Sequence, residues 1–162
     1  MNTLYLEPGD FQFGAAPLRL TTLLGSCVAI TLWHPRRHIG GMCHIQLPGR
    51  SPSGDDKFDG RYAEDAFALF DRELERHGSA AREYVAKLFG AGNMFPGSAA
   101  STINVGAKNL AAARHELARR GLRVAAEHVG GAGHRKLIFD LVNGDVWLAF
   151  SNLEPIKEMA IG

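Results

Sequence analysis

The amino-acid sequence predicts an α+β fold in which helices flank layers of mixed β-sheet. Three observations lead to this class. Strand-like segments crowd the first third of the chain, two amphipathic helices follow, and a hairpin signal comes near the end. The length of 162 residues predicts a single domain over 1–162, which is large enough to bury a core without disulfides or metals.

The first third of the chain is expected to be extended. The composition of Leu18–Leu24 is typical of a strand, Gly25-Ser26 interrupts it, and Val28–Trp33 resumes it. His34-Pro35-Arg36-Arg37 predicts a turn, because proline pre-sets the φ angle that the second turn position needs. Ile39–Leu47 then reads as the returning strand, so these two strands are expected to form a hairpin.

The remaining elements follow from periodicity and from turn residues. Apolar residues at helical spacing predict a helix over Tyr62–His77, which ends at the cap residue Gly78, and a second helix from near Gly106 to before Gly121. We expect loops over Gly49–Gly60 and Met94–Ser101, strands over Tyr84–Phe89, Leu122–Val129, Lys136–Val142 and Val146–Phe150, and a two-residue turn at Asn143-Gly144.

Composition excludes several classes of function. The net charge of +1 creates no strong field that would point to nucleic acid or to a membrane surface. The N-terminus lacks the basic start and apolar run of a signal peptide, and no apolar run approaches the ~20 residues of a membrane helix. We therefore expect a cytoplasmic protein. In that compartment a cysteine more often serves as a reactive group than as half of a disulfide.

The predicted hairpin brings a cysteine towards a histidine. A turn centred between Pro35 and Arg36 would set Cys27 directly opposite His44 on one face of the sheet. The same register would turn Cys43 to the other face. The alternative is a loop lengthened by Arg37-His38, and a slip of one residue would move His44 to the wrong face. The sequence therefore predicts that Cys27 and His44 form a pair, and that Cys43 is structural.

Such a pair is suited to acyl transfer. A cysteine attacks as its thiolate and needs a base, which His44 would supply, and a third group usually orients the imidazole. Thr21 and Thr22 lie one short segment upstream, and either hydroxyl is suitable. Gly25-Ser26 permits a tight turn, so the Cys27 backbone N–H is expected to face an oxyanion.

Two other interpretations of these residues are open. A lone cysteine in an apolar run is more often a small buried hydrophobic residue than a nucleophile. A thiol-based redox or metal protein is the second, but Cys43 and His44 are adjacent and point to opposite faces of a strand, and no Cys-x-x-Cys pair exists. The sequence thus predicts no metal, no other cofactor and no Cys27–Cys43 bond.

Two sequence blocks carry a resemblance to a known family. Leu24-Gly25-Ser26-Cys27-Val28-Ala29 and Gly41-Met42-Cys43-His44-Ile45-Gln46-Leu47-Pro48 resemble the corresponding blocks of CheD, the bacterial chemoreceptor glutamine deamidases, with Gln46 in place of a methionine. Three shorter segments are similar in the same order: Ala86–Gly90, Val105–Asn109, and Val129–Gly131 with Arg135-Lys136. The resemblance covers roughly Leu4 to Phe150.

The resemblance implies a fold and a site. The fold would be that of the cytotoxic necrotizing factor-like cysteine hydrolases. The family's nucleophile falls on Cys27, its histidine base on His44 and its histidine-orienting threonine on Thr21, while Ser26 and Gly25 would contribute to substrate binding.

The resemblance also implies a reaction and its partners. A CheD-like protein hydrolyses selected glutamine side chains on the cytoplasmic helices of chemoreceptors to glutamate, releasing ammonia through a thioester on the cysteine. The alternative is a non-catalytic binding module that regulates a CheC-type chemotaxis phosphatase.

Overall fold

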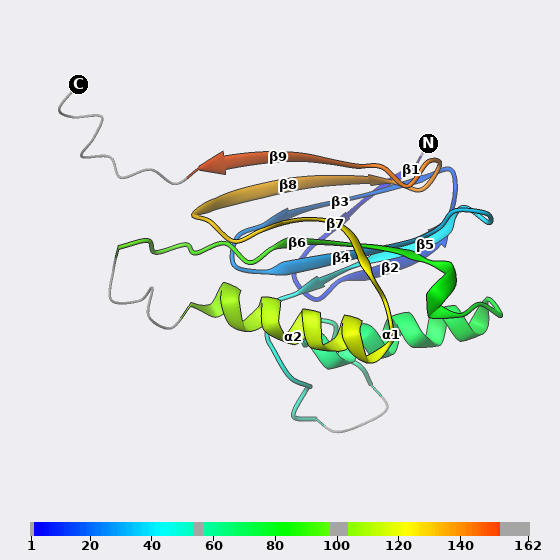
Figure 1. Ribbon diagram of the computed structural model, residues 1–162, viewed down its shortest axis with the longest axis horizontal. Helices are drawn as coiled ribbons and strands as arrows, with labels where there is room; N and C mark the ends of the chain where they lie inside the picture. The colour runs from blue at the N-terminus through cyan, green and yellow to red at the C-terminus, as the bar shows by residue number, and fades with distance from the viewer. Residues whose placement is uncertain (1, 54–56, 98–103, 153–162) are drawn as a thin grey trace.

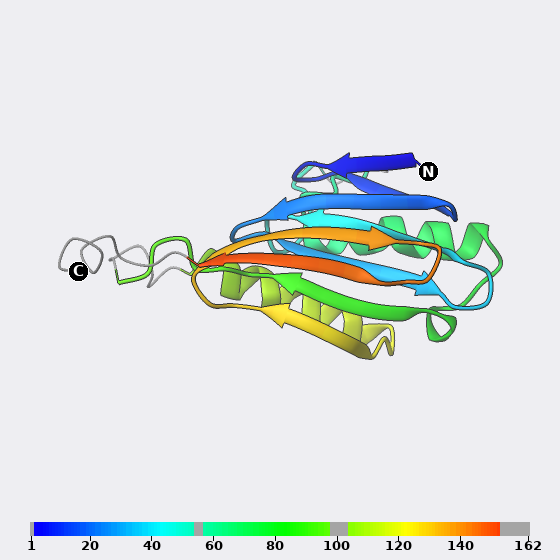
Figure 2. The ribbon, with the colours of Figure 1, turned by 90° about the horizontal axis from the view of Figure 1, so that it is seen from above.

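Three layers make up the computed structural model, which describes residues 2–53, 57–97 and 104–152. A four-stranded sheet lies on a five-stranded sheet, and two helices cover the outer face of the latter (Figure 1). Seen from above, the four-stranded sheet lies in front and the helices lie behind both sheets (Figure 2). The predicted α+β class with layered sheet and flanking helices is confirmed.

The elements lie close to where the sequence predicts them. The strands are β1 (Asn2–Leu6), β2 (Phe11–Ala15), β3 (Leu18–Leu24), β4 (Val28–His34), β5 (Ile39–Ile45), β6 (Val85–Gly90), β7 (Val124–Val129), β8 (Gly133–Asp140) and β9 (Val146–Asn152). The helices are α1 (Ala63–Arg76) and α2 (Val105–Arg119), with a 3-10 turn at Ala81–Glu83. The predicted loops over Gly49–Gly60 and Met94–Ser101 lie partly outside the described residues.

Both sheets are mixed. The four-stranded sheet has the order β1-β3-β8-β9, in which only β1 and β3 run parallel. The five-stranded sheet has the order β2-β5-β4-β6-β7, in which only β6 and β7 run parallel. The central strands β3 and β4 therefore lie in different sheets, although only three residues separate them in the sequence.

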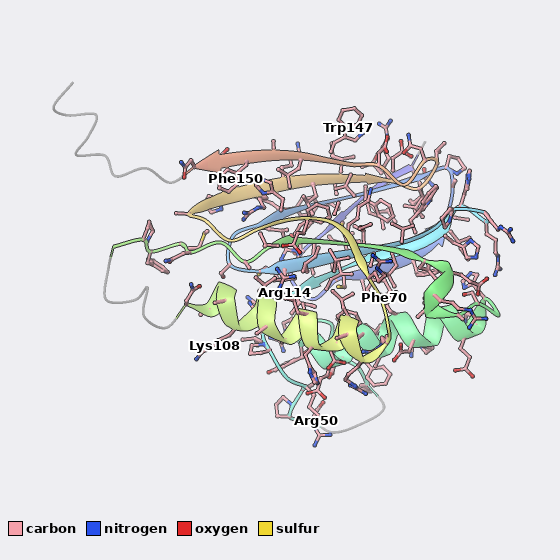
Figure 3. All side chains as sticks on the ribbon, viewed as in Figure 1. Arg50, Phe70, Lys108, Arg114, Trp147 and Phe150 are labelled. Atoms are coloured by element: carbon pink, nitrogen blue, oxygen red, sulfur yellow. The ribbon has the colours of Figure 1, made fainter. Side chains whose placement is uncertain are left out.

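Two cores hold the layers together, and β4 contributes to both. Val28, Ile30 and Leu32 point towards the helices and belong to the same buried cluster as Phe70 of α1. Ala29 points to the opposite side, into the core between the two sheets. The alternation of side chains along a strand produces this division, and β4 is apolar on both faces because both faces are covered. Figure 3 shows Trp147 projecting from the outermost sheet, on the side away from the helices.

The hairpin of β4 and β5 has a different register from the one predicted. Ala29 lies opposite His44, and Cys27 lies before the strand begins. The turn has four residues, 35–38, because His38 takes a positive φ of 51° and its N–H donates to the His34 carbonyl at 2.9 Å. The predicted opposition of Cys27 and His44 is therefore wrong by two positions. A slip of two preserves the face, since side chains alternate with a period of two.

The late hairpin is present, but its predicted two-residue turn is wrong. β8 ends at Asp140 and β9 begins at Val146. The loop is longer because two side chains hold it: Asp140 Oδ1 accepts from the Val142 N–H at 2.9 Å, and Asn143 Oδ1 accepts from the Asp145 N–H at 3.0 Å. Such local bonds from Asp and Asn compete with the strand ladder.

Neither α1 nor α2, the helices of the described residues, combines the length and the apolarity that crossing a membrane requires.

Candidate active site

Cys27 lies in the turn that carries the chain from one sheet to the other. It follows Gly25-Ser26 directly after β3 and precedes the first residue of β4. Its side chain is half-buried and packs against the core between the two sheets, whereas Cys43 is fully buried in the core under the helices. The predicted separation of the two cysteines onto different faces is confirmed.

The end of β6 holds this turn through backbone contacts. The Ala91 N–H donates to the Cys27 carbonyl at 2.8 Å, and the Gly92 N–H donates to the Gly25 carbonyl at 2.9 Å. Gly90 has a φ of 110°, and a Cβ there would collide with the Cys27 carbonyl oxygen. Only glycine accommodates both the conformation and the close approach.

His44 lies on β5 with its ring between the two sheets. The side chain is buried, with 1% of its surface exposed. Its Nδ1 lies 2.7 Å from the hydroxyl oxygen of Thr22, which points inward from β3 in the other sheet. This hydrogen bond joins the two sheets close to the turn that carries Cys27, since His44 pairs with Ala29 two residues after Cys27.

The bonding of Thr22 determines which nitrogen of His44 carries the proton. The Thr22 hydroxyl donates to the Leu6 carbonyl at 2.7 Å, and a hydroxyl has only one proton to donate. Its oxygen must therefore accept from His44, which places the imidazole proton on Nδ1. Nε2 then carries the lone pair, and this is the tautomer that a general base requires.

The threonine in contact with the histidine differs from the one that the resemblance implies. The Thr21 hydroxyl donates to the Leu137 carbonyl at 2.7 Å, on the opposite face of β3. The contact expected of Thr21 is thus made by Thr22, because adjacent residues of a strand point to opposite sides. The sequence held a signal for this: Leu20 and Leu24 are apolar at alternate positions, and Thr22 lies on the same side between them.

Burial keeps both groups neutral in the resting state. It lowers the pKa of His44 from 6.5 to about 4, although the charge of Asp10 opposes part of this shift. It raises the pKa of the Cys27 thiol to about 11. At neutral pH the protein therefore holds a thiol and a neutral imidazole.

The two groups are not hydrogen-bonded to each other in this state. His44 Nε2 is buried and has no hydrogen-bond partner among the described residues. Catalytic hydrogen bonds are often long before substrate binds and tighten in the complex. His44 pairs with Ala29, two residues after Cys27, so an unpaired Nε2 on this residue is consistent with a base that accepts a proton only in the complex.

A cavity of about 210 Å³ opens beside Ser26, in the turn that carries Cys27. Its lining comes from three segments: Ser26, residues Gly92 to Phe95, and Asn104 to Gly106 at the beginning of α2. Gly25 does not line the cavity, but a Cβ there would come within 2.9 Å of the sulfur of Met94, which does. Ser26 therefore borders the predicted substrate pocket, and Gly25 permits the close approach of Met94.

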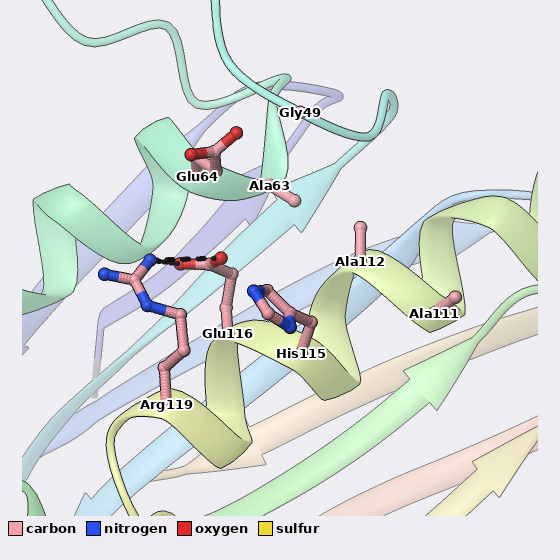
Figure 4. Close-up of a pocket in the computed structure, with 8 residues that line it drawn as sticks. All are labelled: Gly49, Ala63, Glu64, Ala111, Ala112, His115, Glu116 and Arg119. Carbon is pink, nitrogen blue, oxygen red and sulfur yellow. Dashed lines mark hydrogen bonds and ion pairs between the residues drawn. The ribbon is translucent and has the colours of Figure 1, made fainter.

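A second hollow, of about 470 Å³, lies between α1 and α2 (Figure 4). Its lining includes Glu116, whose carboxylate is paired with Arg119 at 3.0 Å. Gly49, Ala63, Glu64, Ala111, Ala112 and His115 complete the lining. Over 2–53, 57–97 and 104–152, no three His, Cys, Asp or Glu side chains converge as ligands for a metal ion.

Comparison with known proteins identifies the family. A family model described as "CheD chemotactic sensory transduction" matches residues 46–150. The chain belongs to the CheD family. It is 47% identical over 150 residues to the probable chemoreceptor glutamine deamidase CheD 3 of Dechloromonas aromatica, covering 93% of this chain and 88% of the relative. It is 45% identical over 157 residues to the probable chemoreceptor glutamine deamidase CheD of Pseudomonas fluorescens, covering 96% and 88%.

The predicted family is thus confirmed, and the resemblance extends beyond the matched model. The CheD model begins at Gln46, just after His44, so it leaves out the turn with Cys27. The relatives span nearly the whole chain. The roles of Cys27, His44, Thr21, Ser26 and Gly25 remain predictions.

The different burial of the two cysteines predicts selective labelling. We expect iodoacetamide to modify Cys27 alone in the folded protein, and slowly, because the raised pKa leaves little thiolate. Cys43 should stay unmodified, since it is fully buried and its pKa is raised to about 12. Peptide mass spectrometry would locate the label, and both cysteines should react in urea. Labelling of Cys43 in the folded C27A variant would contradict this prediction.

The lowered pKa of His44 predicts a loss of stability in mild acid. Between pH 6.5 and about 4 the unfolded histidine binds a proton that the folded one does not. Above pH 6.5 His44 is neutral in both states and does not lower the free energy of unfolding. Below that pH its protonation in the unfolded state lowers the free energy of unfolding, by up to about 3 kcal/mol. Urea unfolding at pH 7.5 and 4.5 measures it. The H44Q variant should lack this part of the decrease, and equal pH dependence in both proteins would contradict the prediction.

Proposed function

We propose that this CheD protein deamidates glutamine side chains of chemoreceptors, with Cys27 as nucleophile and His44 as base. The observation that supports this most is the tautomer of His44. Thr22 holds the proton on Nδ1, so Nε2 carries the lone pair, and Nε2 has no hydrogen-bond partner among the described residues. The names of the curated relatives, chemoreceptor glutamine deamidases, supply the substrate class.

The proposed reaction has two halves. Nε2 takes the thiol proton as the sulfur attacks the carboxamide carbon, and the imidazolium then protonates the leaving nitrogen, so that ammonia departs and a thioester remains. Water attacks the thioester, Nε2 takes one of its protons, and the thiol returns with glutamate as the product. Burial disfavours the imidazolium in the resting site, so the developing charges on sulfur and imidazole must form together.

The nucleophile turn and α2 supply the surroundings of the reacting carbonyl. We propose that its oxygen lies near the Cys27 backbone N–H, at the mouth of the cavity bordered by Ser26. The beginning of α2 contributes Asn104, Val105 and Gly106 to the same cavity, and the first turn of a helix carries a partial positive charge. This charge favours the oxyanion that forms when the thiolate attacks.

The proposed substrate also determines the partners and the location. Because the target is a glutamine on the cytoplasmic helices of a receptor, we propose that the protein works in the cytoplasm. A CheC-type phosphatase is the proposed regulatory partner, and binding without catalysis is the alternative function. The inward-facing set of Thr22, His44 and Cys27 favours catalysis, because binding alone has no need for a buried base.

Removal of the nucleophile or of the base tests this proposal. We expect C27A to abolish conversion of glutamine to glutamate and H44A to lower kcat by about 10²–10⁴-fold, the range typical of a lost general base. The measurement is the +1 Da shift of receptor peptides by mass spectrometry after incubation with a receptor cytoplasmic fragment.

The C43A variant is the matched control, because it removes the other cysteine from the opposite face of the sheet. It should keep its activity. Full activity of C27A would refute the nucleophile assignment, and a wild-type protein that converts no glutamine would favour the binding alternative.

The two neighbouring threonines predict a second, sharper contrast. T22V removes the acceptor of the Nδ1 proton and the hydroxyl that donates to the Leu6 carbonyl, so we expect kcat to fall at least about 10-fold. T21V removes only the bond to the Leu137 carbonyl. The same deamidation assay decides between them: a large loss in T21V with full activity in T22V would assign the orienting role to Thr21.

A further inference from the structure

The side chain of Asn109 joins the two halves of the candidate site. It projects from α2 and is completely buried. Its amide nitrogen donates to the Ser26 carbonyl at 3.2 Å and to the Gln46 carbonyl at 3.0 Å. Ser26 immediately precedes the nucleophile, and Gln46 lies two residues after the histidine, so a single amide group contacts both segments.

These contacts lie where the ladder between β4 and β5 ends. The last pair is Val28 with Ile45, and continuing the register would pair Cys27 with Gln46. The chain departs from the ladder there, because the N–H groups of Gln46 and Leu47 both donate to the Arg61 carbonyl at 2.8 Å. The Asn109 amide bridges the two segments where the next ladder pair is missing, and thereby sets their separation beside Cys27.

The beginning of α2 determines the placement of Asn109. Gly106 lies so close to the turn after β6 that a Cβ there would come within 2.7 Å of the Ala91 carbonyl carbon. Asn109 lies three residues further on, and therefore on the same face of the helix. The close approach at Gly106 brings the amide within reach of the Ser26 and Gln46 carbonyls.

The other polar atom of Asn109 speaks against a packing role. Its Oδ1 is buried and has no hydrogen-bond partner among the described residues. A buried acceptor without a partner costs desolvation free energy, and a leucine of similar size would avoid that cost. The two N–H groups of the amide are therefore what this side chain contributes, through the hydrogen bonds that they donate.

We propose that Asn109 is a positioning residue, which fixes the separation of the Cys27 turn from the strand that carries His44. Its donors hold the two carbonyls, and through them the thiol stays at the distance that lets Nε2 take its proton when substrate binds. This inference rests on the proposed function of Cys27 and His44.

Three variants of the full-length protein test the proposal. N109L removes both donors at similar volume, and N109D replaces the amide by a carboxyl group that has one donor when protonated and none when ionised. A113G is the matched control: Ala113 is buried on the same helix one turn further on, and glycine there weakens α2. The wild-type and the variants are compared by kcat and KM on a receptor cytoplasmic fragment, by urea unfolding, and by the rate of Cys27 modification with iodoacetamide.

A positioning role predicts a particular pattern. N109L should lower kcat about 10- to 100-fold with KM changed less than about 3-fold, since misplacing a reacting group by about 1 Å has effects of this size. For N109D, kcat relative to wild type should rise as the pH falls from 8 to 5, because protonation restores one donor. A113G should lose stability but keep its kcat.

The outcomes separate this proposal from the proposed function. If the wild-type protein converts no glutamine, the proposed function fails, and the iodoacetamide rates still test Asn109: a change of about fivefold or more in N109L and N109D, but not in A113G, supports it. Rates and kcat within twofold of wild type in both variants would overturn it. Failure of both variants to fold, or an equal loss of kcat in A113G, would overturn it in favour of a purely structural role.

Discussion

The hydrogen bond between Thr22 and His44 is the contact on which the rest of the site depends. It lies between two β-sheets, with Thr22 on one and His44 on the other. Because the Thr22 hydroxyl also donates to the Leu6 carbonyl, a single buried oxygen determines the tautomer of the imidazole and ties β1, β3 and β5 together. The stacking of the sheets therefore determines the tautomer of the proposed base, and neither sheet alone would produce this arrangement.

Cys27, the proposed nucleophile, lies where the chain crosses between the sheets. Residues 25–27 leave β3 in one sheet and enter β4 in the other, and this crossing has few ladder bonds of its own. Its carbonyls are taken instead by the backbone after β6 and by Asn109 of α2. Glycines at positions 90 and 106 permit these approaches. The end of β6 and the beginning of α2, which lie far from residues 25–27 in the sequence, thus both contact this turn.

Much of the fold and part of the site were predictable from local patterns. Helical spacing located α1 and α2, strand composition located β3 and β4, and alternation along β5 separated Cys43 from His44. The register of the β4–β5 hairpin was not predictable. It depended on the positive φ of His38, and the sequence offered a loop lengthened by Arg37-His38 only as the alternative to the shorter turn. The residues alone left Thr21 and Thr22 both open as the partner of the histidine, and the resemblance implied Thr21, whereas the choice depends on which face of β3 is covered.

The sequence by itself determined the elements, the residues capable of chemistry and the likeness to the CheD family, because these depend on residue types at fixed spacing. Only the tertiary structure decided which side chains meet. Thr22 and His44 are 22 residues apart, and Asn109 lies 83 residues after Ser26. Contacts over such separations depend on how sheets and helices pack together, and the spacing of neighbouring residues in the sequence does not predict that packing.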